Sequence, residues 1–468
     1  MKHIASILLL LCLNSFIASS QSNQAVIVTA GTNHSLYRCL DNMVYSFGDN
    51  SSGQLGIGSF NDAISPTPIS MLSGIVDIAS SGFHTLLLKN DGTVWACGWN
   101  FAGQLGDSTN IGRATPVQVL GLTNIVDIAA GQSHSVFIKD DGTVWACGDN
   151  ITGQLGDGTT ISKNYPVQVL NVANAIKASG GTYHSVFLMS DSTVMACGGN
   201  YSGQLATGNL IEQHVAISIN GLSGISDVSC GSTHSMFLKS NGTVLTSGSN
   251  SYGELGLETT TDTSIATQIN SLSGIAKISA GYSHSLFLKD DGTVYGCGLN
   301  IYGQLGNGTS TTSGVNPPSL VLNLSNVGLI TGGSSHSLFV QNNGSIWACG
   351  SNSDGQLGDN GSVLGFSNIP VQTINACLTT DISLMEEKPN VFVYPNPTNE
   401  YLFLDVSNAN DKLESIIIFD VLGNRIYNST VKDVNFKINT TAFQYGIYCY
   451  QLTDESGIVR HSGKFIKE

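Results

Sequence analysis

Seven histidines recur at one position of a repeated sequence, and they are the first residues of this chain that could do chemistry. Imidazoles at regular spacing could bind a metal ion or act as general bases. A catalytic or metal site breaks the symmetry of a repeat, whereas a residue present in every copy is more often needed for packing or a turn hydrogen bond. We therefore predict a structural role, with no catalytic residue, no metal and no cofactor. The histidines are His34, His84, His134, His184, His234, His284 and His336, a step of 50 residues that lengthens to 52 at the end.

Cysteines share a second repeat position in five of the seven copies, and Phe47 and Ser247 replace them in the others. A zinc site needs ligands paired at close spacing, such as CxxC, and this chain has none. We predict small buried residues that stay reduced, because neighbouring copies are too far apart for the Cα distance of about 7 Å that a disulfide allows. The five are Cys97, Cys147, Cys197, Cys297 and Cys349. The pairing of the cysteines outside this register stays open, namely Cys39, Cys230, Cys377 and Cys449.

An enzyme on this scaffold would need an asymmetric group of acids and bases in the loops of a few copies. The candidates are Glu212 and His214 in the fourth copy and Glu254 and Glu258 in the fifth. Glu254 replaces the glutamine of the GQLG tetrad, and the fifth copy is the only one with this exchange. Drift of a repeat residue explains that exchange more readily than catalysis does. Neither a phosphate-binding GxxxxGK[ST] loop nor a GxSxG nucleophile motif occurs.

The elements that hold these residues are four short runs of strand-forming residues in each copy. In the third copy they are Ile125–Ala129, His134–Lys139, Thr143–Cys147 and Pro166–Leu170. An Asp-Gly turn joins the second run to the third, which is a strong hairpin signal. Periods of about 50 residues are typical of propellers. Seven copies of four strands, without helical periodicity, predict an all-β chain that contains a seven-bladed β-propeller.

The repeat text GxxHSxxLxxDGTVxxCGxNxxGQLGxG resembles the regulator of chromosome condensation repeat family over residues 25–376. That resemblance implies a seven-bladed propeller, in agreement with the strand count. The best-known member of the family acts on chromatin and exchanges nucleotide on a GTPase. Nucleotide exchange is therefore a further functional hypothesis, carried by the resemblance alone.

The N-terminus has the pattern of a secretory signal peptide over residues 1–20: a basic start, the apolar run Ile4–Ile17 and a small-residue cleavage site. No later run is long and apolar enough to predict a transmembrane segment. The chain has 18 basic and 33 acidic residues, a net charge of −15. Such an acidic excess opposes nucleic-acid binding, which requires basic surfaces. We predict no nucleic-acid partner and an exported protein.

After a linker at 377–389, residues 390–468 alternate apolar and polar residues in short runs, which predicts a small antiparallel β-sandwich. Their motifs resemble the C-terminal sorting domain of the type IX secretion system, which is confined to the Bacteroidota. The resemblance implies handling by that machinery, removal of the domain, and then either release or attachment to surface lipopolysaccharide. An ordinary ligand-binding sandwich is the alternative. The matching residues are Tyr394, Pro395, Asn396, Pro397, Gly423, Gly446, Tyr448, Gly463 and Lys464.

If the four strands run up and down in order, the segment before each histidine and the long loop after each CGxN lie on one face of the ring. We call this the loop face, and the opposite face, which carries the Asp-Gly turns, the turn face. Large apolar residues gather at loop-face positions that vary between copies, and Tyr and Trp are favoured interface anchors. The alternative is that these rings only cover the blade tops. The candidate binding residues are Phe83, Trp99, Phe101, Ile151, Tyr183, Tyr201, Tyr252, Tyr282, Ile301 and Tyr302.

These observations favour a secreted or cell-surface module that binds an unidentified protein or glycan. A propeller-borne lyase or hydrolase with a loop-face site is the alternative, and nucleotide exchange is the least favoured. The identity of the ligand, the oligomeric state and the way in which the ring closes stay open.

Overall fold

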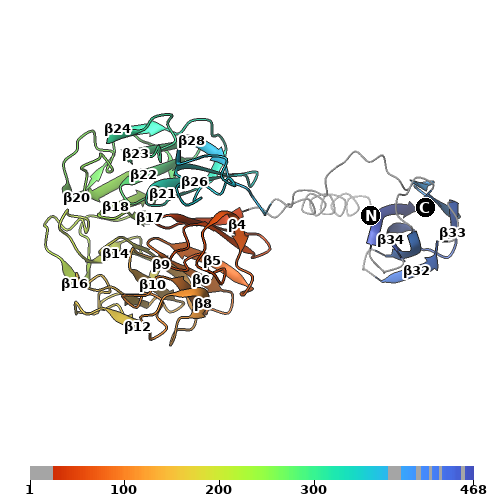
Figure 1. Ribbon diagram of the computed structural model, residues 1–468, viewed down its shortest axis with the longest axis horizontal. Helices are drawn as coiled ribbons and strands as arrows, with labels where there is room; N and C mark the ends of the chain where they lie inside the picture. The colour runs from red at the N-terminus through yellow and green to blue at the C-terminus, as the bar shows by residue number, and fades with distance from the viewer. Residues whose placement is uncertain (1–24, 378–391, 407–412, 421–423, 432–434, 455–458) are drawn as a thin grey trace, which may run out of the picture. The chain divides into compact units, whose positions relative to one another are not determined.

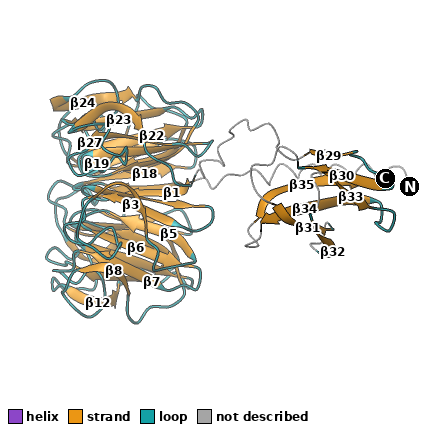
Figure 2. Ribbon diagram, turned by 45° about the vertical axis from the view of Figure 1, so that its right-hand side comes forward, coloured by secondary structure: helices purple, strands orange, loops and turns teal. Residues whose placement is uncertain are grey.

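The computed structural model describes residues 25–377, 392–406, 413–420, 424–431, 435–454 and 459–468. The predicted signal peptide and nearly all of the predicted linker lie outside these residues. The chain divides into two compact units at residue 379. Strands and loops, but no helix, make up the described residues (Figure 2). Among them no helix long and apolar enough to cross a bilayer is found.

The first unit is a ring of seven four-stranded antiparallel sheets around a central axis, which confirms the seven-bladed propeller (Figure 1). Each repeat forms one blade, and we number the blades in chain order. In each blade the first strand lies next to the axis and the fourth lies at the rim. Blades one to four comprise β1 (Ala25–Ala30), β2 (His34–Cys39), β3 (Val44–Gly48), β4 (Ala63–Pro68); β5 (Ile75–Ser80), β6 (His84–Lys89), β7 (Val94–Gly98), β8 (Arg113–Gln118); β9 (Ile125–Ala130), β10 (His134–Lys139), β11 (Val144–Gly148), β12 (Lys163–Gln168); and β13 (Ala175–Gly180), β14 (His184–Met189), β15 (Val194–Gly198), β16 (Gln213–Ser218). Blades five to seven comprise β17 (Ile225–Cys230), β18 (His234–Lys239), β19 (Val244–Gly248), β20 (Thr263–Gln268); β21 (Ile275–Ala280), β22 (His284–Lys289), β23 (Val294–Asn300), β24 (Thr311–Leu320); and β25 (Val327–Gly332), β26 (His336–Gln341), β27 (Ile346–Ser351), β28 (Phe366–Gln372).

The hairpin between the second and third strands of a blade is set by its Asp-Gly pair. In blade three the Asp141 carboxylate accepts hydrogen bonds from the backbone N–H and the hydroxyl of Thr143, at 2.9 and 2.6 Å. The third strand is followed by a long loop and then by the rim strand. In blade three that strand begins at Lys163, three residues before the run that the sequence indicated. Rim strands contain prolines such as Pro166, which protect an exposed sheet edge from pairing with other chains.

Neighbouring blades are held together by apolar clusters that draw residues from both. Between blades two and three, Leu86 and Val94 pack with Ile125, Phe137 and Cys147, all of them buried. A fully buried ring such as that of Phe137 stabilises the fold by about 2 kcal/mol. The core of the molecule therefore consists of the seams between blades.

The ring closes at the seam between blades seven and one, and each of these blades comes from one continuous repeat. A disulfide joins Cys39, at the end of β2, to Cys377, with a sequence separation of 338. The Tyr37 hydroxyl accepts a hydrogen bond from the Ala376 backbone N–H at 2.9 Å. Cys377, where the sequence analysis begins the linker, is fully buried in the cluster that joins these two blades. The disulfide therefore bonds the last described residue of the ring to the first blade.

The second unit consists of two small antiparallel sheets packed on one core, as the sandwich prediction requires (Figure 2). Its core includes Leu404, Ile416, Ile418, Leu452 and Phe465. One sheet has the order β29-β30-β33 and the other β32-β31-β34-β35. The strands are β29 (Phe392–Tyr394), β30 (Tyr401–Asp405), β31 (Leu413–Phe419), β32 (Arg425–Thr430), β33 (Asn435–Asn439), β34 (Gly446–Asp454) and β35 (Val459–Lys467).

Candidate functional site

Each repeat histidine is buried and joins its blade to the next one. The His84 Nε2 atom lies 2.9 Å from the Ser135 hydroxyl of the following blade. That hydroxyl donates its one proton to the Gln104 carbonyl oxygen at 2.7 Å, so the histidine Nε2 must be the donor in the first bond. The same contact links all seven blades in a closed cycle of histidine and serine or threonine pairs, which ends with His336 and Ser35 at 2.8 Å.

The histidines are neutral because burial lowers their pKa to about 3 or 4. The Nδ1 atom of His134 has no hydrogen-bond partner and faces Gly131, where an added Cβ would lie 2.5 Å from it. This contact explains the glycine that stands three residues before six of the seven histidines, whereas Ser81 stands there before His84. These side chains can neither bind a ligand in place nor reach solvent, which supports the structural role predicted for them.

Buried amide side chains hold the long loops in shape. The Asn150 Oδ1 atom accepts the Leu155 backbone N–H at 2.9 Å, and its Nδ2 atom donates to the carbonyls of Thr159 and Ile161 at 3.0 and 3.3 Å. Gly153, the first residue of the GQLG tetrad, has φ of 81° and packs against His214 of the next blade. A Cβ at Gly153 would lie 2.6 Å from the His214 Cα. The constant residues of each loop thus fix the frame on which its variable residues are displayed.

Glu254 is part of this frame. Its carboxylate accepts hydrogen bonds from the Ser249 hydroxyl at 2.9 Å and the Tyr252 backbone N–H at 2.8 Å. Burial is the main cause that raises the pKa of Glu254. In blade one the matching pair is Gln54 and Asp49, whose donor and acceptor roles are reversed. The glutamate and serine pair of blade five therefore takes the place of the glutamine and aspartate pair of blade one.

We expect Glu254→Gln to change the free energy of unfolding by less than about 1 kcal/mol, because a hydrogen bond is retained. Blade seven already contains the resulting pair: the Gln356 amide donates to the Ser351 hydroxyl at 3.2 Å. Chemical denaturation of the full chain measures the change. Glu254→Ala, which leaves Ser249 without its partner, is the control and should cost more. A loss of binding activity in the Gln variant with stability intact would instead give Glu254 a functional role.

The loop face brings several of the predicted aromatic residues together. Because strands alternate in direction, the segment before each histidine and the long loop meet. In blade two the Trp99 backbone N–H donates to the Phe83 backbone carbonyl at 2.8 Å. The rings of Phe83, Trp99 and Phe101 form a row with centroid separations of 6.0 and 6.4 Å. Tyr183 and Tyr201 repeat this contact in blade four at 6.5 Å.

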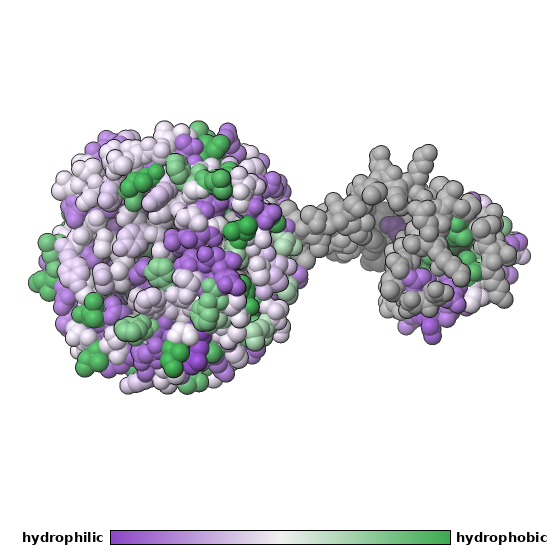
Figure 3. All heavy atoms as spheres, in the orientation of Figure 1, coloured by the Kyte–Doolittle hydropathy of each residue, from purple (hydrophilic) through white to green (hydrophobic). Residues whose placement is uncertain are grey.

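The candidate residues differ in how far they are exposed. Phe83 and Tyr183 are half-buried beneath the exposed rings of their own blades. Phe101 is the most exposed candidate, at 80%, while Trp99 and Tyr201 are 44% and 53% exposed. The remaining candidates are also exposed: Ile151, Tyr252, Tyr282, Ile301 and Tyr302. In the view of Figure 3, apolar side chains form several separate patches on the ring among polar ones.

The sequence reasoning missed a second set of exposed apolar residues in the long loops. Ile161 follows Ile151 by ten residues, and Ile111 and Ile211 occupy the same place after Phe101 and Tyr201. This regular spacing was the available signal. Tyr165 at the start of β12 and Phe366 at the start of β28 are also exposed, and Phe366 contacts Tyr302 with centroids 6.4 Å apart.

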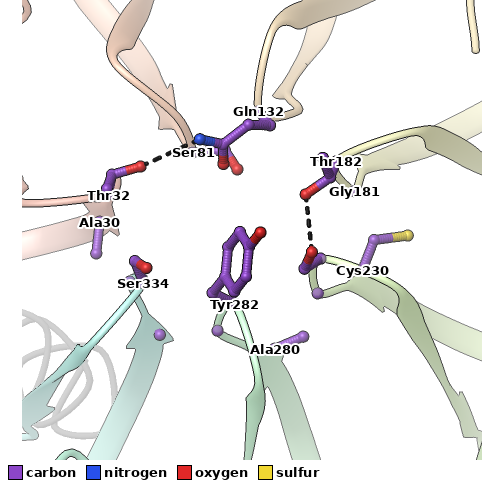
Figure 4. A pocket seen from close by; sticks show the side chains of 15 residues that line it. Ala30, Thr32, Ser81, Gln132, Gly181, Thr182, Cys230, Ala280, Tyr282 and Ser334 are labelled. Atoms are coloured by element: carbon purple, nitrogen blue, oxygen red, sulfur yellow. Dashed lines mark hydrogen bonds between the residues drawn. The ribbon is translucent and has the colours of Figure 1, made fainter. Parts of the chain in front are cut away.

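The central channel is narrow and polar at its loop-face mouth. Tyr282 lies in the middle of the mouth, surrounded by Thr32, Gln132, Thr182 and other small polar residues (Figure 4). The cavity there has a volume of about 30 Å³. That volume suits about one water molecule and is too small for a sugar or a nucleotide. Tyr282 is therefore set apart from the aromatic rows of blades two and four.

Charged side chains at the third position of the inner strands were also missed. Asp77, Asp127, Lys177, Asp227 and Lys277 come from five successive blades, and Lys177 forms an ion pair with Asp227. Burial raises the pKa of Asp127 to about 7, although its carboxylate accepts the Ala178 N–H at 3.0 Å. Among the described residues no group of three or more His, Cys, Asp or Glu is placed to hold a metal ion.

The candidates for an enzyme site form two separate groups. His214 Nε2 lies 2.8 Å from a Glu212 carboxylate oxygen, and both side chains are 40% exposed. Glu254 is buried in its own loop, and the Glu258 N–H donates to the Asn316 side chain of blade six at 3.1 Å. Within the described ring no hydrogen bond or ion pair joins the two groups. The arrangement gives no pair of acid and base facing a shared pocket.

The sorting-motif residues form the frame of the second unit. Tyr448 is buried against Phe465, with ring centroids 5.5 Å apart, and Asn396 accepts the Ile466 N–H at 2.9 Å. Gly463 lies under the Tyr450 ring, where a Cβ would lie 2.5 Å from the hydroxyl oxygen. Of the motif residues, Tyr394, Pro395, Asn396, Pro397, Gly446 and Lys464 are exposed, whereas Gly423 lies outside the described residues.

Solved structures similar to this chain share the propeller. The yeast RCC1 protein Prp20, in a crystal structure with Kap60, is 21% identical, with a TM-score of 0.64 over 76% of this chain and 86% of that one. Human WBSCR16 is 22% identical, with a TM-score of 0.64 over 71% and 94% of the two chains. These identities establish the fold alone. Among curated protein sequences there is no match.

Family models match both units of the chain. The model of the RCC1-like domain matches residues 70–381, and models of the RCC1 repeat match residues 41–88 and 25–54. The model of the secretion system C-terminal sorting domain matches residues 392–468. After its propeller, the sequence continues with a secretion system sorting domain. Since the first match alone spans about two thirds of the sequence, the chain belongs to the RCC1-like domain family.

Proposed function

We propose that this protein is an exported binding module that holds a protein or glycan partner on the loop face of its propeller. The observation that carries the proposal is that, within each repeat, the constant residues are buried and the variable loop residues are exposed. The constant histidines, asparagines and glutamines are buried, whereas the varying loop positions display exposed side chains such as Trp99, Phe101 and Tyr201. Exposed aromatic residues in adjacent loops are typical of interfaces.

The sorting domain supports the location of this module. It implies export to the cell surface or secretion, with handling by the type IX machinery. We propose in addition that residues 1–20 are a signal peptide and that residues 390–468 are removed after export. Release into the medium and attachment to surface lipopolysaccharide are then the two fates of the propeller.

The proposal is tested with Trp99→Ala combined with Tyr201→Ala. We expect partner binding to weaken by about 2 kcal/mol or more, because anchoring aromatic residues dominate interface energies. Unfolding temperature should stay near that of the wild type, since both side chains are about half exposed. A glycan array and a binding assay with candidate protein partners measure the change.

The matched control is Asp191→Asn on the turn face. Blade five has Asn241 at this position, where it accepts the Thr243 N–H just as Asp191 accepts the Thr193 N–H. The control should therefore fold and bind normally. If the control loses binding and the aromatic variant keeps it, the working surface is the turn face and the proposal is wrong.

A further inference from the structure

The two faces of the propeller differ sharply in charge. In the described ring, residues 25–377, the long loops and adjoining strand starts of the loop face contain eleven acidic and two basic residues. The turn-face segments contain seven acidic and five basic residues. The loop-face acids are Asp49, Asp62, Asp107, Asp149, Asp157, Glu212, Glu254, Glu258, Asp262, Asp354 and Asp359. The excess of negative charge therefore lies on the face that displays the aromatic residues.

Both basic residues of the loop face are already neutralised. The Arg113 guanidinium lies 2.9 Å from the Asp107 carboxylate, and the Lys163 ammonium lies 3.7 Å from that of Asp157. In the described part of this face no lysine or arginine forms an ion pair with any of the other nine acids. The pKa of Asp354 is raised by partial burial and then by the nearby charges of Asp49 and Asp62. Negative potential thus remains uncompensated on the loop face.

A groove of about 520 Å³ combines this charge with aromatic surface. It lies between the long loops of blades two and three and is lined by Phe101, Asp149, Ile161 and Tyr165 among others. Lys163 also lines it, and its ammonium group is paired with the Asp157 carboxylate. Phe101, Ile161 and Tyr165 are 80%, 65% and 50% exposed. The Asn164 amide donates to the Asn110 side-chain oxygen at 3.0 Å and ties the two blades together along the groove.

Rings beside a carboxylate are the surroundings that a guanidinium or an ammonium group prefers. A cation stacks on an aromatic face and at the same time donates hydrogen bonds to a carboxylate. Anionic glycans and nucleic acids would be repelled by a face of this charge, and a neutral glycan would gain nothing from it. Charge complementarity therefore selects among the ligands that aromatic rings alone would accept.

We propose that this groove binds an arginine or lysine side chain of a basic protein segment, so that the partner of the loop face is a cationic protein rather than a glycan. This inference rests on the proposed function and names the class of partner for the same surface. Long-range attraction by the acidic face would speed association and would weaken as salt rises.

The test uses the full chain and a short fluorescent peptide of alternating arginine and glycine as the probe. Peptides with serine or glutamate in place of arginine are the comparison probes. We expect only the arginine peptide to bind, and its Kd should rise several-fold between about 0.05 M and about 0.2 M NaCl. Binding of the serine peptide with equal affinity would overturn the inference.

The repeat itself supplies variants that preserve the fold. Phe101→Ser places in blade two the residue that blades one, five and seven have there, namely Ser51, Ser251 and Ser353. Asp149→Ser copies Ser351, whose hydroxyl accepts the neighbouring glutamine amide at 3.2 Å. The double variant should raise the Kd of the arginine peptide about tenfold or more. Asp191→Asn, which removes one charge from the turn face, should change it less than about twofold.

The outcomes separate this inference from the proposed function. Equal losses of affinity for the arginine peptide in the double variant and in Asp191→Asn would mean that the peptide binds through the net charge of the protein alone. The assignment of its site to the groove would then be wrong. If a glycan binds and is lost in the Trp99→Ala and Tyr201→Ala variant while the arginine peptide fails to bind, the loop face is a binding site but its partner is not cationic. If no ligand responds to that aromatic variant, the proposed function itself fails.

Discussion

Acidification from about pH 6 to about pH 5 is expected to lower the free energy of unfolding of the propeller by roughly 7 kcal/mol. The seven repeat histidines have folded pKa values of about 3 or 4, below the value of about 6.5 that they have in an unfolded chain. The unfolded state therefore binds more protons in this range. Stability is fully present above about pH 6.5 and is lost as the pH falls toward the folded pKa values.

Buried carboxylates whose pKa is raised, namely those of Asp77, Asp127 and Glu254, oppose this trend, and Asp127 has the large shift. The pKa of Asp127 is raised to about 7, so its folded form binds a proton that the unfolded form releases above about pH 4. Its contribution rises as the pH falls, by about 1.4 kcal/mol per pH unit, against the same amount lost at each of the seven histidines. The histidines therefore decide the direction in which the free energy of unfolding changes with pH: it falls as the pH falls.

Urea denaturation at a series of pH values measures this effect, because the slope of unfolding free energy against pH counts the protons taken up on unfolding. We expect about five protons near pH 5.5, and about one fewer in a His134→Gln variant. The variant also loses the hydrogen bond to Ser185, so its stability at pH 8 should be lower while its binding is unchanged. A slope near zero in the wild type would mean that the folded histidines are protonated, which contradicts their buried, neutral state.

Removing the ring-closing disulfide is expected to have the second largest effect. Replacing Cys39 and Cys377 with alanine should lower the free energy of unfolding by roughly 5 kcal/mol, because their bond closes a loop with a separation of 338 residues. The loss should appear as a lower midpoint in urea and as earlier opening of the seam between blades seven and one.

A reducing agent provides the control for this comparison. It should destabilise the wild type to a similar extent and leave the double variant unchanged, because every other cysteine of the described residues is a free thiol. Equal midpoints for the wild type and the double variant under oxidising conditions would show that the seam is held by its apolar cluster and hydrogen bonds alone.

The number and order of the blades could be predicted because each repeat carries its own strand, turn and loop signals. The alternation of strand direction then gave the two faces, since Phe83 and Trp99 had to meet if the strands ran up and down. In the second unit, five of the seven strands could be predicted from alternating runs, which are Leu402–Val406, Ser415–Phe419, Val434–Ile438, Gly446–Gln451 and Gly463–Ile466. The edge strand β32 was not, because its residues are largely exposed and polar and therefore lack that alternation.

The contacts between blades could not be predicted from the sequence, because they join residues that are far apart along the chain. The serine or threonine that follows each histidine seemed to belong to the same motif, although its hydroxyl bonds the histidine of the preceding blade about 50 residues away. The Cys39–Cys377 pair is visible only after the ring has closed. The charges of Asp77, Asp127 and Lys177 were overlooked because each stands alone in its repeat, and only the ring axis brings them together.

The closed seam also fixes where the chain enters and leaves the propeller. Ala25 pairs with Cys39 across β1 and β2, and Cys39 bonds Cys377, so the first and last described residues of the ring meet at one point. That point is the turn-face end of blade one, beside its hairpin turn. Whatever is joined to either end of the ring is therefore joined on the side away from the aromatic loops. Both ends of the described ring therefore lie on the face opposite to Trp99, Phe101 and Tyr201, and neither end occupies the loop face.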